Sequence, residues 1–271
     1  MKKINSVIVI VLICTISIGC SGREYDTSES MANGWSGSIR IEGKNNTIWN
    51  GVVTVTDTYF DAINVETNET EKYYISYPSP LGAVVQAATV GGFSFNIDYY
   101  PDFDAFLVSK INDDSDWWHL WVDYELPMIG ANAYKLTEED NEIIFGYLES
   151  WYAHALIIEV DKSEVKKDET ITVNVFDETN TSVCDASVYV NSEIYTTDNE
   201  GKARITLSNK GKHYIYSEMD GFVRSDKVSV QVKKKSLIKT LETLSLNNLF
   251  GQILKIIKNI KPYNILNNYK L

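Results

Sequence analysis

The segment Trp117-Trp118-His119-Leu120-Trp121-Val122-Asp123-Tyr124 holds three of the six tryptophans in the chain. Successive side chains of a β-strand point to opposite faces of the sheet. Trp117, His119 and Trp121 therefore share a semi-polar face with Asp123. The other face has the composition of a hydrophobic core. The pattern predicts a strand through residues 117–124 with one face packed in a domain interior.

The tryptophans have two interpretations. One large aromatic side chain buries roughly 150–250 Å², so three of them within five residues ordinarily serve packing. The alternative is that Trp117, His119 and Trp121 line a groove for a small planar ligand, because pockets combine aromatic walls with a few polar groups. Exposure of Trp117 and Trp121 would favour ligand binding, and burial would favour packing.

The segments before this strand alternate between strand and helix patterns. A helix is expected from Pro80, with Ser79 as its N-cap and the pair Gly91-Gly92 at its end. Period-two alternation predicts the strands around it. They lie at Ser38–Ile41, Val52–Val55, Tyr73–Ser76, Phe93–Ile97 and Ala105–Val108. We therefore expect an α+β domain over residues 35–152.

The order of motifs in this domain resembles the transcobalamin-like C-terminal domain family over roughly residues 50–150. The motifs are Pro80-Leu81-Gly82-Ala83, Gly91-Gly92-Phe93, the aromatic strand continuing through Leu126-Pro127-Met128-Ile129-Gly130-Ala131, and Tyr134-Lys135-Leu136-Thr137-Glu138-Glu139-Asp140. The resemblance implies a small β-grasp-like fold. It also makes a cobalamin-like corrinoid a candidate cofactor, since the related domain of transcobalamin helps to cover its corrinoid.

The chain departs from the pattern of that family at two turns. Family members commonly read Val-Asn-Gly where this chain has Val122-Asp123-Tyr124, and a Gly-Asp turn where it has Glu139-Asp140. Both departures bear on the shape of a loop and leave the expected fold unchanged.

Residues 153–232 show short alternating strands at near-regular spacing, which predicts an antiparallel β-sandwich. The segment Asp198-Asn199-Glu200-Gly201 supplies a tight turn. The expected strands are Ala155–Val160, Thr170–Phe176, Ala186–Val190, Lys202–Leu207, His213–Met219 and Lys227–Val232. The stretch from Val183 to Ala203 resembles carboxypeptidase regulatory-like and bacterial immunoglobulin-like modules. Chains that pair these two domain types resemble surface proteins of methane-producing archaea.

The N-terminus has the layout of a secretory signal: Lys2 and Lys3, an apolar run from Val7 to Ile18, and small residues before Cys20. Ser17-Ile18-Gly19-Cys20 resembles a lipobox, in which the cysteine receives lipid before cleavage, although Ser17 replaces the usual leucine. Ordinary cleavage before Cys20 and an uncleaved anchor are the alternatives. We expect a signal over residues 1–20, a linker over 21–34 and an exported protein at the outer face of the cell membrane.

Residues 233–271 form a basic tail. Eight lysines stand there against the single acid Glu242, whereas the whole chain has a formal net charge of −12. Apolar residues at helical spacing predict an amphipathic helix. The tail either packs on the acidic domains or lies on anionic lipid as a second membrane contact. The strongly acidic remainder of the chain argues against nucleic-acid binding.

The sequence offers few groups for catalysis or metal binding. His119, His154 and His213 are its three histidines, and no two have the spacing of a zinc motif. Besides Cys20, only Cys184 remains after signal removal, so no intramolecular disulfide framework is expected. We therefore expect no metal and no catalytic residues.

The sequence as a whole predicts a mainly β protein: a β-grasp-like α+β domain, an antiparallel β-sandwich and a C-terminal amphipathic helical tail. It favours a non-catalytic surface protein that binds a small planar ligand or acts as a scaffold. A structural or adhesion spacer without a ligand is the alternative, and an extracellular hydrolase comes third. The oligomeric state is left open.

Overall fold

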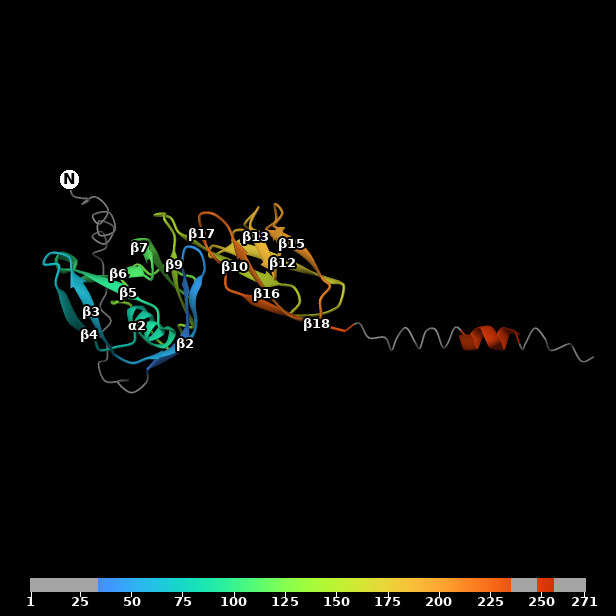
Figure 1. The fold of residues 1–271 in the computed structure, drawn as a ribbon, viewed down its shortest axis with the longest axis horizontal. Helices are drawn as coiled ribbons and strands as arrows, with labels where there is room; N and C mark the ends of the chain where they lie inside the picture. The colour runs from blue at the N-terminus through green and yellow to red at the C-terminus, as the bar shows by residue number, and fades with distance from the viewer. Residues whose placement is uncertain (1–33, 235–247, 256–271) are drawn as a thin grey trace, which may run out of the picture.

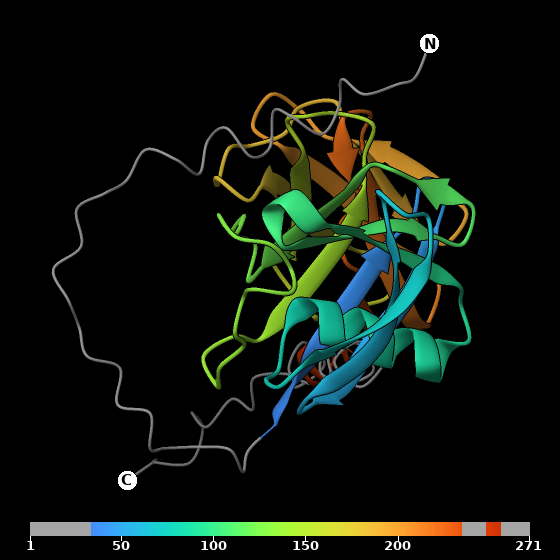
Figure 2. The same cartoon turned by 90° about the vertical axis from the view of Figure 1, so that its left-hand side faces the viewer.

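A computed structural model of the chain describes residues 34–234 and 248–255. The chain is mainly β and forms two units side by side, an N-terminal unit of residues 34–150 and a C-terminal unit of residues 153–234 (Figure 1). Figure 2 looks onto the N-terminal unit with the C-terminal unit behind it. Within the described ranges, no helix is both long and apolar enough to cross a membrane.

The N-terminal unit contains two sheets. The first has the order β2-β1-β9-β8, in which the central strands β1 and β9 run parallel and each outer strand is antiparallel to its neighbour. Its strands are β1 (Trp35–Glu42), β2 (Thr47–Val55), β8 (Trp118–Val122) and β9 (Glu142–Tyr147). The second has the order β4-β3-β5-β6-β7. Its strands are β3 (Thr58–Asn64), β4 (Thr70–Ile75), β5 (Phe95–Tyr100), β6 (Ala105–Ile111) and β7 (Asp114–Ser115), with the 3-10 helix η1 (Pro101–Phe103) before β6.

Helix α2 (Pro80–Gly91) begins and ends at the residues that the sequence predicts. The Ser79 hydroxyl accepts a hydrogen bond from the Gly82 backbone N–H at 3.1 Å, which satisfies one of the free donors of the first turn. Gly92 ends the helix at φ 70°, a conformation in which a side chain would be strained. The predicted cap, first turn and end are confirmed.

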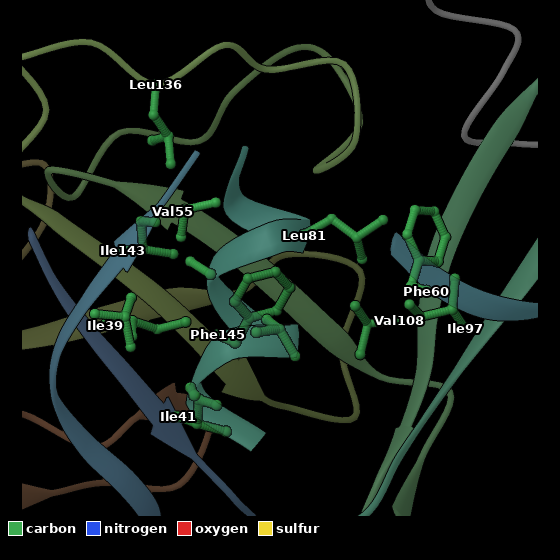
Figure 3. Close-up of a cluster of buried hydrophobic side chains, with 14 of the residues drawn as sticks. Ile39, Ile41, Val55, Phe60, Leu81, Ile97, Val108, Leu136, Ile143 and Phe145 are labelled. Carbon is green, nitrogen blue, oxygen red and sulfur yellow. The ribbon is translucent and has the colours of Figure 1, made fainter. Parts of the chain in front are cut away.

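The core of the N-terminal unit lies where the helix meets both sheets. Figure 3 shows α2 between the strands that carry Ile39, Ile143 and Phe145 and those that carry Phe60, Ile97 and Val108. Leu81, Ala83, Val84 and Ala87 of the helix are completely buried. Small residues on α2 allow this close packing from two sides.

The C-terminal unit is a sandwich of two sheets, with the orders β15-β12-β10-β17 and β11-β18-β16-β13-β14. The first comprises β10 (His154–Val160), β12 (Glu169–Asp177), β15 (Lys202–Leu207) and β17 (Phe222–Val223). The second comprises β11 (Glu164–Lys166), β13 (Ser187–Val190), β14 (Glu193–Thr196), β16 (Gly211–Glu218) and β18 (Val228–Lys233). Aliphatic side chains of both sheets meet in one core, among them Ile171, Val188, Ile205, Ile215 and Val230.

The prediction of a purely antiparallel sandwich is wrong at two edges. β17 pairs with β10 in parallel, and β11 pairs with β18 in parallel. Parallel neighbours need a long connection, and in both cases many residues separate the paired strands. Since β11 precedes β12 directly but joins the opposite sheet, the chain changes sheets there, which strand periodicity alone does not indicate.

The aromatic strand is shorter than predicted. β8 ends at Val122 because Asp123 and Tyr124 adopt φ values of 48° and 64°. Val122 and Glu125 exchange two backbone hydrogen bonds of 2.9 Å across them, as in a two-residue hairpin turn. Tyr124 therefore does not continue the core face of the strand.

Two predicted segments lie mainly outside the described residues. The signal segment, Cys20 and most of the linker belong to the first 33 residues. In the tail, β18 runs through Lys233, and residues 248–255 are helical with all eight residues exposed. Leu249, Phe250, Ile253 and Leu254 are the large apolar side chains on this helix.

Candidate functional site

The face of the first sheet that points away from α2 is covered by the C-terminal unit. Ile39 and Ile41 of β1 point into the N-terminal core, so Arg40 and Glu42 point to the opposite side. Arg40 is 0% exposed and Glu42 is 1% exposed. Such burial of charged residues on an outer sheet face follows from their contacts with the second unit.

Two arginines, one from each unit, share Glu42. Arg40 Nη1 lies 3.3 Å from Glu42 Oε1, and Arg224 Nη1 lies 2.9 Å from Glu42 Oε2. Arg40 Nη1 also donates to the Arg224 carbonyl oxygen at 2.8 Å, and Arg40 Nη2 donates to the Tyr124 hydroxyl at 3.1 Å. We call Arg40, Glu42, Tyr124, Glu142, Glu218 and Arg224 the junction network.

The remaining glutamates complete the network around the arginines. Arg40 Nε lies 3.4 Å from Glu142 Oε1, and Arg224 Nε donates to Glu218 Oε1 at 2.5 Å. Burial alone would lower the pKa of Arg40, but Tyr124, Glu42 and Glu142 raise it above its ordinary value. The pKa of Glu142 is raised because its burial outweighs the attraction of Arg40. Both arginines are therefore charged, and each depends on partners in the network.

An apolar cluster lies in the junction beside the network. It consists of Trp121, Ile144, Ala153, Ala155 and Val223, and Trp121 is completely buried. Gly146 on β9 permits the close approach, because a Cβ atom there would lie 2.5 Å from both methyl groups of Val223. The semi-polar face of β8 is thus covered at Trp121 by the second unit.

The predicted ligand residues are separated by this burial. Trp121 is enclosed in the apolar cluster, and its Nε1–H has no hydrogen-bond acceptor among the described residues. His119 is partly buried, its Nε2 lies 3.0 Å from the Leu148 carbonyl oxygen, and burial lowers its pKa. Trp117 is the third predicted residue and is only partly buried. The expected groove with both Trp117 and Trp121 in its wall is not formed, because the C-terminal unit covers Trp121.

Trp117 instead packs against the exposed aromatic residue Trp151. Its ring meets that of Trp151 edge to face, with centroids 5.2 Å apart and an interplanar angle of 68°. Trp151 is 52% exposed and Tyr152 is 85% exposed. We call Trp117, Trp151 and Tyr152 the aromatic lip. Sequence reasoning missed its last two members, although adjacent large aromatics between two expected domains are a visible signal.

A cleft of about 840 Å³ lies at the junction, and Ser150, the residue before Trp151 in the chain, is one of its lining residues. One wall comes from the β1–β2 turn and residues 147–150, and the other comes from β13 and the segment around β17. The lining residues are Glu42, Gly43, Lys44, Asn45, Tyr147, Leu148, Glu149, Ser150, Asp185, Ser187, Tyr189, Glu218, Met219, Asp220, Gly221, Phe222, Val223 and Arg224. Five carboxylates and two cations therefore face this space.

One histidine meets a carboxylate near the junction. His154 Nδ1 lies 2.7 Å from Glu178 Oε1, and Glu178 also accepts the Ala155 backbone N–H. Among the described residues, no hydroxyl or thiol is hydrogen-bonded to His154. A pair of this kind orients a side chain, but a hydrolase also needs a nucleophile within reach of the base. His213 contacts Asn191 and the Asn209 carbonyl oxygen and is buried.

The structure gives no support for a reactive Cys184 or, in the described residues, for a metal site. Cys184 donates to Asn199 Oδ1 at 3.4 Å, and its hydrogen bond with Asp185 raises the pKa of the thiol, which disfavours the reactive thiolate. In the part of the chain that the structure describes, no three His, Cys, Asp or Glu side chains are grouped to hold a metal ion.

Comparisons with known proteins do not assign the chain to a family. No family model and no curated protein matches the chain. Among solved structures, the extracellular domain of a hybrid two-component system from B. thetaiotaomicron aligns with 73% of this chain at 9% identity and a TM-score of 0.21. The chain covers 26% of that protein. A likeness of this extent carries no argument about fold or function.

Proposed function

We propose that this chain is a non-catalytic protein of the outer cell surface, a rigid two-domain scaffold that presents a ligand-binding junction. The observation that carries the proposal is the sharing of Glu42 by Arg40 and Arg224, one from each unit. Removing one partner from a buried ion network leaves an uncompensated charge, so separation of the units is costly.

The fold assignment within this proposal is a β-grasp domain followed by a sandwich module. Support comes from the order of the first sheet, in which the strands β1 and β9 are parallel neighbours and each pairs with an antiparallel outer strand. The motifs that resemble the transcobalamin-like C-terminal family lie on α2, β8 and the segments after them. The aliphatic sandwich supports the immunoglobulin-like or carboxypeptidase regulatory-like assignment.

Membrane attachment is proposed to occur through lipid on Cys20. The helix at residues 248–255, within the predicted basic tail, would add a second contact through its exposed apolar side chains. A single acyl chain binds membranes only marginally, so a second signal is needed for stable attachment. Packing of the tail on the acidic domains is the alternative, and it would keep this helix off the lipid.

The ligand is proposed to bind at the junction, beside the aromatic lip. A flat corrinoid would be held best between two facing rings. The Trp117 and Trp151 rings meet edge to face, so these two rings do not form a parallel-sided slot for a flat ligand. If the junction binds no ligand, the same rigid arrangement would serve a structural or adhesion spacer.

Surface location is tested by expressing the full chain and its Cys20→Ser variant, followed by metabolic labelling with a lipid precursor and protease treatment of intact cells. The proposal predicts a lipid-labelled, membrane-bound chain that external protease digests. The Cys20→Ser chain is expected to lose the label. Protection from external protease while the cells remain intact would contradict the proposed location.

A further inference from the structure

We propose that the cleft at the junction binds a neutral saccharide chain. This inference rests on the proposed ligand-binding function and names the chemical class of the ligand. Pockets for small ligands commonly occupy roughly 300–1,000 Å³ and lie at domain interfaces. The cleft of about 840 Å³ between the two units meets both conditions.

Aromatic and polar groups are interleaved in the cleft. Tyr147, Tyr189 and Phe222 contribute partly exposed rings, and Tyr189 is held in place by a nearly parallel stack on Tyr216 with centroids 4.8 Å apart. The C–H groups of a sugar ring carry partial positive charge and pack on the negative face of such rings. A rigid ring fixed by its neighbour offers this contact with little loss of entropy.

Hydrogen-bonding groups are spread over both walls. Asn45 and Ser187 can donate and accept, whereas Glu149 and Asp220 accept. Sugar hydroxyls also donate and accept, so a polyhydroxylated ligand can use all of these groups. A compact ion would need grouped ligands, and the described residues contain no such group. The dispersed arrangement therefore favours a polyol over a cation.

The charge of the cleft argues against anionic ligands. The lining carries Glu42, Glu149, Asp185, Glu218 and Asp220 against Lys44 and Arg224. Both cations are already paired, Lys44 with Glu149 at 2.6 Å and Arg224 with Glu42 and Glu218. Like charges facing each other suppress binding, so phosphates and acidic sugars are disfavoured.

The aromatic lip is the proposed binding surface for the part of a longer ligand that leaves the cleft. Ser150 lines the cleft, and Trp151 and Tyr152 follow it directly in the chain with exposed rings. A saccharide chain longer than the cleft would continue onto these rings. Affinity is therefore expected to increase with chain length.

The test uses the full chain in detergent and isothermal titration calorimetry. The probes are cellohexaose, mannohexaose and the fully N-acetylated chitohexaose, with hexagalacturonate as the anionic match. The inference predicts saturable binding of at least one neutral hexasaccharide and at least tenfold weaker binding of hexagalacturonate. Absence of binding by all three neutral probes, or equal binding of the uronate, overturns it.

Variants then place the site. Tyr189→Ala and Trp151→Ala are expected to weaken binding about tenfold or more, whereas Tyr59→Ala changes an exposed ring on β3 and is expected to change it less than twofold. Exchange of the exposed residues Asp185 and Asp220 for lysine is expected to give measurable hexagalacturonate binding in a folded chain. Unchanged affinities in all of these variants overturn the site.

A surface-exposed chain that binds no saccharide would refute this inference alone and leave the proposed location standing.

Discussion

The core of the C-terminal unit and the junction between the units differ in the kinds of side chain that they bury. The core consists of aliphatic side chains such as Ile171, Ile205 and Val230, all without polar atoms. The junction combines the buried charges of Arg40 and Glu42 with the Trp121 cluster. Apolar packing has no preferred direction, whereas hydrogen-bonded ion pairs require particular positions of both partners.

The two kinds of packing differ in how well they tolerate substitution. An apolar core tolerates changes of shape if its volume is kept. A buried network tolerates little, because each missing partner leaves a charge or donor unpaired. The junction is therefore expected to define orientation, while the cores define the fold of each unit.

The largest effect is expected from Arg40→Ala. The change removes the ion-pair partner of Glu142 and leaves Glu42 with Arg224 alone, and breaking a buried pair costs about 3–5 kcal/mol. Urea unfolding measures the loss. Lys44→Ala, which breaks an exposed pair with Glu149, is the control and is expected to give no measurable change. If the junction contributed nothing to stability, both variants would show similar free energies of unfolding.

A smaller loss is expected from Gly146→Val. The added side chain would collide with Val223, and overpacking of a close contact costs about 1–3 kcal/mol. The collision lies between the units, so small-angle scattering should report a change in their arrangement while circular dichroism keeps the strand signal. Gly146→Ala should give an intermediate result. Unchanged scattering from a folded Val variant would show that the units do not approach closely here.

A loss of about 1 kcal/mol is expected from Tyr124→Phe. The change removes the hydroxyl that accepts from Arg40 Nη2, while Arg40 keeps its carboxylate and carbonyl partners. The matched control is Tyr134→Phe, whose hydroxyl bonds Asp140 inside the N-terminal unit. Scattering should change only for Tyr124→Phe, and equal effects of both variants on the arrangement of the units would contradict the account.

The smallest effect is a pH dependence from His119. Burial lowers its pKa in the folded chain, so its neutral form is favoured there and the unfolded chain binds a proton more readily. The contribution to stability is present above the unfolded value of about 6.5 and decreases as pH falls below it. His119→Gln should flatten this part of the stability profile measured by thermal unfolding from pH 7 to 5. Parallel profiles of the variant and the unchanged chain would contradict this role.

Local chemistry predicted much of the fold. Ser79, Pro80 and Gly92 act within a few residues of their own positions, so their roles in starting and ending α2 follow from the sequence. Alternation placed most strands of the sandwich. The central strand β9 was missed because Ile143, Ile144 and Phe145 are all buried, so the segment shows no alternation.

The candidate site depended on contacts that local patterns do not contain. The semi-polar face of β8 was assigned correctly by alternation, but its cover comes from Val223, about 100 residues further along the chain. Arg40 and Glu42 are polar residues of an alternating strand pattern that is typical of a solvent-exposed sheet face, and their burial follows from the docking of a second unit. Docking of this kind leaves no local trace in a single sequence.

Differential scanning calorimetry of the full chain and its Arg40→Ala variant shows whether the two units unfold together. If the junction network holds the two units together, the unchanged chain should unfold in one transition whose calorimetric and van't Hoff enthalpies agree. The Arg40→Ala chain should show two separate transitions. Two separated transitions already present in the unchanged chain would contradict the account.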